Sequence, residues 1–372
     1  MKREPEARRI PAHEAFYPAA ALYAALALPA SVIAMTGGAG AVPALANPAA
    51  HAHEMLLGYA LAVVAGNQLG VARGRFIVAL LLLWTAARAS FLLAPASLLA
   101  GVLNAAFAGA LAFRVVPRLF GSAKKLRNQA LPAVLAALCA AAAAWQFARY
   151  ASDPGVPRAL ILATVMLFAL LMLFMGGRIL AAAVAGQLQR QGERLDARVQ
   201  PRLEAALLIA GAIAAGALLA PGLQAVAATA AAMAGTVAAL RLARWRLWAV
   251  RGRPDLLCLA AGYGWLAAGL LALSVSIAVG RFENAALHLI TIGALGTLTF
   301  NVMVMSWRLK ARRALAGHSA VVLGTGLLAA ATVLRLLGAF HPEGPWLLVA
   351  AGCWSSAFAL LIALFWRNRR RN

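Results

Sequence analysis

The chain has 372 residues, of which 63% are hydrophobic and 12% are charged. A soluble domain has about 45–50% apolar and about 25% charged residues, so this composition excludes a soluble globular protein and indicates a polytopic membrane protein. Lys and Arg number 34 against 11 Asp and Glu, a net charge of +23. Because the basic residues lie between apolar runs, we expect them to set membrane topology and expect no nucleic-acid binding.

Twelve apolar runs approach the length of about 20 residues that a helix needs to cross a bilayer. In chain order they are 17–36, 52–72, 76–94, 97–116, 128–149, 158–186, 203–220, 222–247, 255–280, 284–307, 317–339 and 346–366. The stretch 203–247 is divided at Pro221-Gly222, because this pair is typical of a turn. We therefore expect an all-α bundle of about twelve transmembrane helices over 17–366, between polar tails over 1–16 and 367–372.

The basic residues alternate from one loop to the next. If the N-terminus is inside, the inner segments hold 29 Lys and Arg residues, and the outer loops hold only Arg149, Arg158 and Arg281. The positive-inside rule then places both termini in the cytoplasm. The N-terminal tail has no apolar core followed by a cleavage site, so we expect no cleaved signal. These patterns predict a multi-pass protein of the bacterial inner (cell) membrane, with the lipid bilayer as its main partner.

Ionisable side chains inside membrane spans are costly and mark functional sites by default. The candidates here are His51, His53, Glu54, Arg88, His288 and Arg335. They come from four different spans, and the predicted orientation places all six in the outer half of the membrane. We therefore expect them to meet in one layer near the outer face.

Imidazole is a good ligand for haem iron, copper and zinc, and Arg pairs well with the propionates of a haem. His51 and His53 point about 200° apart on a helix, so only one of them faces a given partner. His53 is the deeper of the two, and we prefer it, with His288, as a cofactor ligand. His318 is a further candidate metal ligand at the inner end of its span, where a simple helix start explains it as well.

A structural explanation of the same residues is left open. In it, His51 and His53 are interfacial residues, and the arginines pair with Glu54 or with backbone carbonyls. Pairs of glycine such as Gly176-Gly177 likewise permit either close helix packing or room for a flat cofactor.

Several known chemistries are excluded by motif. No span carries a pair of histidines about four turns apart, as a cytochrome-b-like bundle requires. There are too few histidines within spans for a haem-copper oxidase. The HAHEM sequence lacks the HExxH spacing of zinc hydrolases, and a phosphate-binding Gly-rich loop is missing.

The sequence resembles the NnrS family of twelve-span membrane proteins. The residues that carry the resemblance are His51 to Gly58 (HAHEMLLG), Leu83-Trp84 with Arg88, Gly176-Gly177-Arg178, Ala286 to Thr299 (ALHLITIGALGTLT), Gly317-His318 and Arg335. The chain departs from the family pattern on the inner side, with GNQLGVARGRF after the second span and NVMVMSWRLKARR after the tenth. The pattern is that of a divergent member.

The resemblance implies bound haem and copper and a role in the response to nitric oxide and nitrosative stress, as in denitrification. It also implies that His53 and His288 are ligands. Two other functions stay open: a transporter of a small molecule, metal or haem, and a non-catalytic protein that assembles or regulates a membrane complex. Whether the protein turns over a substrate does not follow from the sequence.

Overall fold

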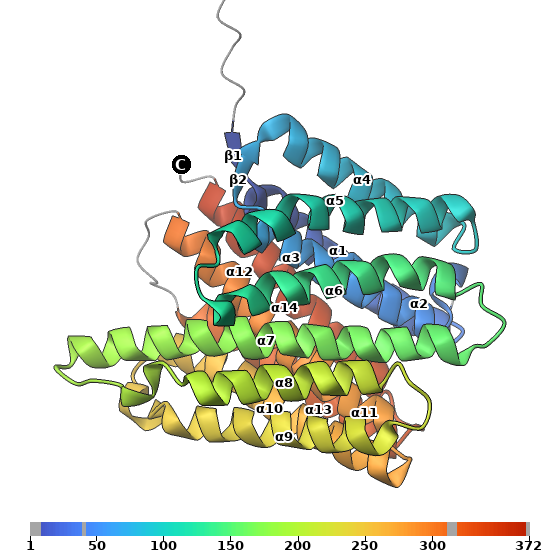
Figure 1. Ribbon diagram of the computed structural model, residues 1–372. Helices are drawn as coiled ribbons and strands as arrows, with labels where there is room; N and C mark the ends of the chain where they lie inside the picture. Colours follow the sequence, from blue (N-terminus) through green and yellow to red (C-terminus); the bar gives the residue numbers. More distant parts are fainter. Residues whose placement is uncertain (1–8, 39–41, 311–317, 370–372) are drawn as a thin grey trace, which may run out of the picture.

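A computed structural model describes residues 9–38, 42–310 and 318–369 of the chain. The structure is 85% helical, and its helices lie side by side in one bundle (Figure 1). The main helices are α1 (Ala12–Met35), α4 (Gly74–Leu93), α5 (Leu98–Ser122), α6 (Leu126–Ala148), α7 (Gly155–Arg190), α8 (Pro201–Ala217), α9 (Gln224–Arg244), α10 (Pro254–Val279), α12 (Thr297–Lys310), α13 (His318–Phe340) and α14 (Trp346–Arg369).

Shorter segments connect or extend these helices. They are α2 (Pro48–His53), η2 (Glu54–Ala60), α3 (Leu61–Gln68), α11 (Glu283–His288) and η5 (Leu289–Gly296), with single 3₁₀ turns η1 (Pro43–Leu45), η3 (Asp196–Arg198) and η4 (Leu247–Val250). Two three-residue strands, β1 (Arg9–Pro11) and β2 (Val71–Arg73), pair antiparallel with Ile10 opposite Ala72. This small ribbon holds the start of α1 beside the start of α4.

Ten helices of the described chain are long and apolar enough to cross a membrane. The other two expected spans have different forms. The run expected at 52–72 consists of α2, η2 and α3 in direct succession, with a π-helical turn in the middle. The run expected at 203–220 is α8, which has 17 residues. The all-α polytopic fold is therefore confirmed, with ten membrane-length helices where about twelve were expected.

The predicted turn at Pro221-Gly222 separates α8 from α9. Gly222 has φ +85°, a left-handed conformation that glycine adopts without steric cost. The span expected at 158–186 is longer in the structure, because α7 has 36 residues. At 1.5 Å per residue such a helix is about 54 Å long. It exceeds the hydrocarbon core of about 30 Å and extends past its neighbours (Figure 1).

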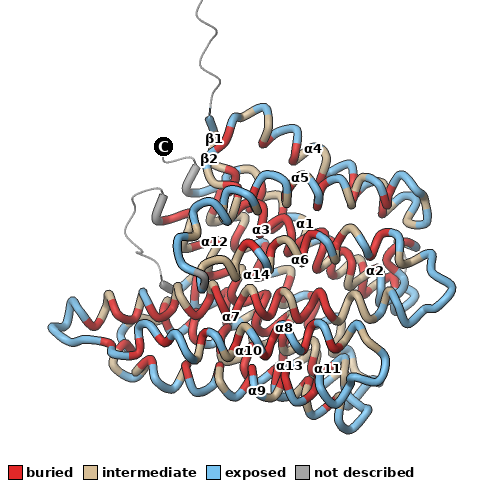
Figure 2. The backbone as a smooth tube through the Cα atoms, in the orientation of Figure 1, coloured by how far each residue is buried: buried red, intermediate tan, exposed pale blue. Residues whose placement is uncertain are grey.

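Buried residues follow the inner sides of the helices, and the outer sides are exposed (Figure 2). Glycines allow the inner helices to approach closely. A Cβ added at Gly262 would lie 2.8 Å from Leu298, and one at Gly296 would lie 2.7 Å from Trp354. Here the glycine-rich faces serve helix packing, one of the two roles that the sequence left open.

The bundle has two distinct ends. The end of α1, the start of α2, the start of α11 and the end of α13 lie at the right-hand end in Figure 1. The ribbon of β1 and β2 and the end of α14 lie toward the opposite end. The four segments at the right-hand end bring together the histidines that the sequence analysis singled out.

Candidate functional site

Two histidines from different helices face one another at the right-hand end of the bundle. The ring centroids of His51, on α2, and His288, on α11, are 6.5 Å apart, with 21° between the ring planes. Nδ1 of His51 lies 3.0 Å from the Ser31 hydroxyl. Nδ1 of His288 lies 2.5 Å from the backbone carbonyl oxygen of Asn284. Each imidazole is thus held at Nδ1, which directs its Nε2 away from these contacts.

A guanidinium completes this group, which we call the histidine pair site: His51, His288 and Arg335. Arg335 comes from the last turns of α13 and is close enough for its charge to act on both imidazoles. Within the described chain no carboxylate forms an ion pair with Arg335. The three side chains are half-buried. The site therefore offers two imidazoles and one guanidinium whose positive charge no carboxylate of the described chain pairs with.

A second polar group lies around Glu54, the first residue of the π-helical segment η2. The carboxylate is completely buried and accepts hydrogen bonds from three side chains. Arg88 Nη1 and His53 Nδ1 each lie 2.6 Å from Glu54 Oε1, and the Tyr23 hydroxyl donates to Oε2. Arg88 also donates to the side-chain oxygen of Asn104. We call these residues the Glu54 network.

His53 is fixed at both of its ring nitrogens. Besides the Nδ1 contact with Glu54, its Nε2 lies 2.9 Å from the side-chain amide nitrogen of Gln146. The ring stacks between Phe91 and Trp145, with centroid distances of 4.1 and 4.5 Å. These contacts assign the proton to Nδ1, because Nε2 accepts from the amide. They leave His53 no nitrogen for a metal unless the Gln146 contact is broken.

A glycine makes room for the buried ion pair. A Cβ at Gly58 would lie 2.8 Å from Arg88 Nη1 and 3.3 Å from Glu54 Oε2. The carbonyl of Gly58 accepts a hydrogen bond of 3.0 Å from Trp84 Nε1. In a π-helix the backbone bonding pattern shifts by one residue, and such turns are frequent at functional sites. The HAHEMLLG motif therefore encodes both the charged residues and the space that they need.

The six residues predicted to share one layer lie at one end of the bundle but divide into two groups. His51, His288 and Arg335 form the histidine pair site. His53, Glu54 and Arg88 form the Glu54 network, in which Arg88 pairs with the carboxylate as the structural explanation proposed. His318 begins α13 near the opposite end, and its side chain lies outside the described residues.

Sequence reasoning did not select four polar partners of these groups. They are Tyr23, Ser31, Asn104 and Gln146. The signal for Asn104 and Gln146 was present, because a primary amide inside an apolar span needs hydrogen-bond partners there. Ser31 and Tyr23 are common in transmembrane helices and carry no such signal in one sequence.

The donor set limits the metal chemistry available. No group of three or more His, Cys, Asp or Glu able to hold a metal was found among the described residues. Zinc sites use three or four protein ligands, so a pair of imidazoles does not make a zinc site. Haem needs fewer protein ligands, because its porphyrin supplies four nitrogens and the protein only axial ones. The histidine pair site fits a haem iron on the chemistry of its donors.

Comparison with known proteins gives one clear likeness. The family model described as NnrS protein matches residues 11–369 of the chain. The match extends from the last residue of β1 to the end of α14 and includes both polar groups. No curated protein matches the chain.

Proposed function

The chain belongs to the NnrS family, and on this premise we propose that it is a haem-binding integral membrane protein that binds nitric oxide or a related small molecule in a nitrosative-stress response. The observation that carries the proposal is the pair of imidazoles of His51 and His288. Their ring centroids are 6.5 Å apart, and each ring is held at Nδ1 by a neighbouring oxygen. An imidazole that ligates a metal is typically oriented by such a hydrogen bond at its other nitrogen.

The residues of the histidine pair site have separate roles in this proposal. His51 and His288 would hold the iron, Ser31 and the Asn284 carbonyl orient the two imidazoles, and Arg335 would pair with a propionate. A guanidinium suits that role because it stays charged and forms two parallel hydrogen bonds with a carboxylate. Haem would supply an iron atom that takes nitric oxide as a ligand in exchange for one of the two imidazoles.

The Glu54 network supports the site mechanically. His53 and Glu54 fix the end of α2 against α4 and α6 through Arg88 and Gln146. Because His51 is two residues from His53 on the same short helix, this anchoring sets the position of its imidazole. In this proposal His53 positions α2, and His51 is the ligand.

The family resemblance also implies copper. Imidazole is a suitable ligand for copper, and His318 at the inner end of α13 is a further candidate ligand. Metal analysis of the purified protein distinguishes the cases: haem alone gives iron, and a copper site adds copper that the substitution His318→Ala removes.

We further propose that the chain crosses a bacterial inner membrane twelve times, with both termini in the cytoplasm. The run α2–η2–α3 covers 21 residues, 48 to 68, and α8 covers 17. Adding both to the ten longer helices gives an even number, as expected when the alternating arginines place both tails inside. Cysteines introduced at Glu343 and Lys124 test this, because only the former should react with an impermeant reagent in intact cells.

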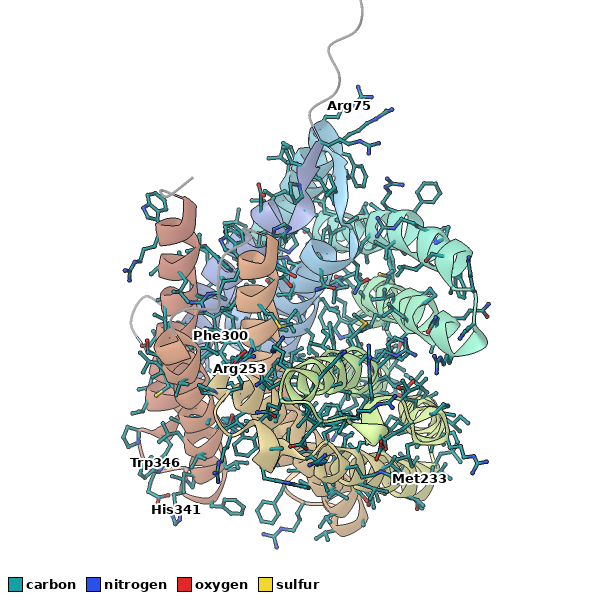
Figure 3. All side chains as sticks on the ribbon, turned by 90° about the vertical axis from the view of Figure 1, so that its left-hand side faces the viewer. Arg75, Met233, Arg253, Phe300, His341 and Trp346 are labelled. Atoms are coloured by element: carbon teal, nitrogen blue, oxygen red, sulfur yellow. The ribbon has the colours of Figure 1, made fainter. Side chains whose placement is uncertain are left out.

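The function is tested by optical spectroscopy of protein purified after haem-replete expression. The wild type should show a Soret band that shifts when nitric oxide is added. His51→Ala and His288→Ala should each weaken the band and change its position. His341→Ala is the matched control, because His341 is exposed in the turn between α13 and α14 (Figure 3).

The results distinguish a specific haem site at the histidine pair from a general affinity of the protein for haem. Loss of the band in the two site variants, with the control unchanged, supports ligation by the histidine pair. A wild type without a Soret band, or three variants that behave alike, would contradict the proposal.

A transporter is a second candidate, favoured by one observation. Both helices that carry the histidine pair change to π-helical pitch directly after a histidine, at η2 after His53 and at η5 after His288. π-helical turns are frequent at functional sites, and the substrate sites of many transporters are built where the regular geometry of a helix is interrupted. Uptake of a small molecule into proteoliposomes by protein without haem would favour this function.

A further inference from the structure

A cavity of about 210 Å³ lies at the opposite end of the bundle from the histidine pair site. It lies between the first turn of α6, the second half of α7, the turn η3 and the first turn of α8. Its lining residues are Arg127, Arg178, Ala182, Arg198, Val199 and Glu204. Three guanidiniums and one carboxylate thus surround this space.

The single carboxylate is already neutralised. Glu204 lies 3.2 Å from Arg178 and 3.6 Å from Arg241, which is almost completely buried behind the cavity. In the part of the chain that the structure describes, Arg127 and Arg198 have no acidic partner. The cavity therefore carries an excess of positive charge, which only an external anion can balance.

The Gly176-Gly177-Arg178 motif builds the inner wall of this cavity. A Cβ at Gly177 would lie 2.9 Å from Arg241 Nη1, so glycine leaves the space that Arg241 occupies. Arg178 donates to the side chain of Asn128 at 2.9 Å, and its guanidinium lies 3.9 Å from the ring centroid of Phe174. These contacts hold the Arg178 side chain in place before any ligand binds.

The cavity lies at the depth of lipid headgroups. Arg178 is 23 residues from the start of α7 at Gly155, or about 35 Å along the helix. The hydrocarbon core is about 30 Å thick, so Arg178 lies at its edge. Beyond it, α7 continues to Arg190 and projects past the neighbouring helices (Figure 1).

We propose that this cavity binds a phosphate group, held by the guanidiniums of Arg127, Arg178 and Arg198. Guanidinium forks match the geometry of phosphate oxygens and form strong charge-assisted hydrogen bonds with them. Basic cavities between transmembrane helices on the cytoplasmic side suit anionic lipid headgroups. The phosphate of a lipid and a free phosphate share this chemistry. The inference uses none of the histidine pair site residues and is independent of haem binding.

Native mass spectrometry of the full chain in detergent tests the proposal. Phosphatidylglycerol or phosphatidylcholine is added to the wild type, to the double variant Arg127→Gln/Arg198→Gln and to a control, Arg194→Gln/Arg251→Gln. The control removes two exposed arginines from the same end of the bundle. We expect the cavity variant to bind phosphatidylglycerol about 10- to 30-fold more weakly than the wild type, and the control to bind as the wild type does.

Competition with inorganic phosphate distinguishes the two sources of the phosphate group, a lipid headgroup and free phosphate. If it displaces phosphatidylglycerol from the wild type at millimolar concentration, the cavity recognises the phosphate group itself. If it does not, and the cavity variant still loses the lipid, the ligand is the lipid headgroup. Equal binding of phosphatidylglycerol by wild type and cavity variant, or an equal loss in the control, would overturn the proposal. Circular dichroism melting of both double variants checks the fold, which should be unchanged because all four side chains are exposed.

Discussion

Glu54→Gln gives the sharpest test of the buried Glu54 network. The substitution keeps the size of the side chain and removes its charge, which leaves the Arg88 guanidinium buried without a counter-ion. Arg88 Nη1 and Glu54 Oε1 are 2.6 Å apart, and the side chains are 4% and 0% exposed. For charge centres about 4 Å apart, an effective dielectric constant of about 20 gives an attraction of about 4 kcal/mol. Breaking one side of a buried ion pair typically costs about 3–5 kcal/mol, and we expect a loss of that size in the free energy of unfolding.

The measurement is reversible unfolding in mixed micelles of a mild detergent and sodium dodecyl sulfate, followed by circular dichroism. Glu283→Gln is the matched control. Its partner Arg158 lies 2.8 Å away but is 68% exposed. Surface ion pairs contribute about 0–1 kcal/mol, so this variant should unfold almost as the wild type does. A loss at Glu54 as small as that at Glu283 would refute the claim that the network holds a buried charge pair.

Removing both charges extends the same reasoning. In the double variant Glu54→Gln/Arg88→Gln neither charge is left alone in the bundle. The loss should therefore be smaller than the sum of the two single losses by at least about 1 kcal/mol. A strictly additive result would mean that the two side chains act on stability independently.

Two further predictions concern packing and hydrogen bonding inside the bundle. A Cβ added at Gly324 would overlap the ring of Phe300 (labelled in Figure 3), which is fully buried. Gly324→Ala should therefore lower the free energy of unfolding by about 1–3 kcal/mol. Gly109→Ala, where no atom lies within 4 Å, is the control and should cause no loss. Tyr59→Phe removes a hydrogen bond of 2.5 Å to Thr299 and should cost about 0.6 kcal/mol, and no more than about 1.7. Both are measured by the same unfolding assay, and a Gly324 variant as stable as its control would contradict the packing.

Much of the fold could be predicted from the sequence because bilayer thickness and charge alternation constrain it strongly. The division at Pro221-Gly222 is one example, since the ends of α8 and α9 lie on either side of it. The length of α7 could not be predicted, because the residues that follow the apolar run, up to Arg190, continue the helix outside the hydrocarbon core. Hydropathy measures the part of a helix inside the membrane and not its full length.

The π-helical turns were also beyond sequence reasoning. The residues of Glu54–Ala60 carry no sequence signal for a π-helical turn, and the hydrogen bond from Trp84 to the Gly58 carbonyl within it is a tertiary contact. These turns shift which side chains share a helix face. The expected preference for His53 rested on depth alone, and depth does not show that Gln146 and Glu54 already occupy both nitrogens of that ring.

The convergence of charged residues at one end was predictable in part. Counting residues from the ends of the spans placed His51, His288 and Arg335 at one depth, and they do lie together. The same count could not separate them from Glu54 and Arg88, because depth fixes only one coordinate. Which residues meet within a layer depends on the order of helices around the bundle.

The most direct test of the central claim is the haem content of the purified protein. The pyridine haemochrome assay measures it in the wild type, in His51→Ala/His288→Ala and in His341→Ala. The account predicts haem in a fixed ratio to protein for the wild type and the His341 variant, and almost none for the double variant. Haem retained by the double variant at the level of the wild type, or absent from all three, would contradict it.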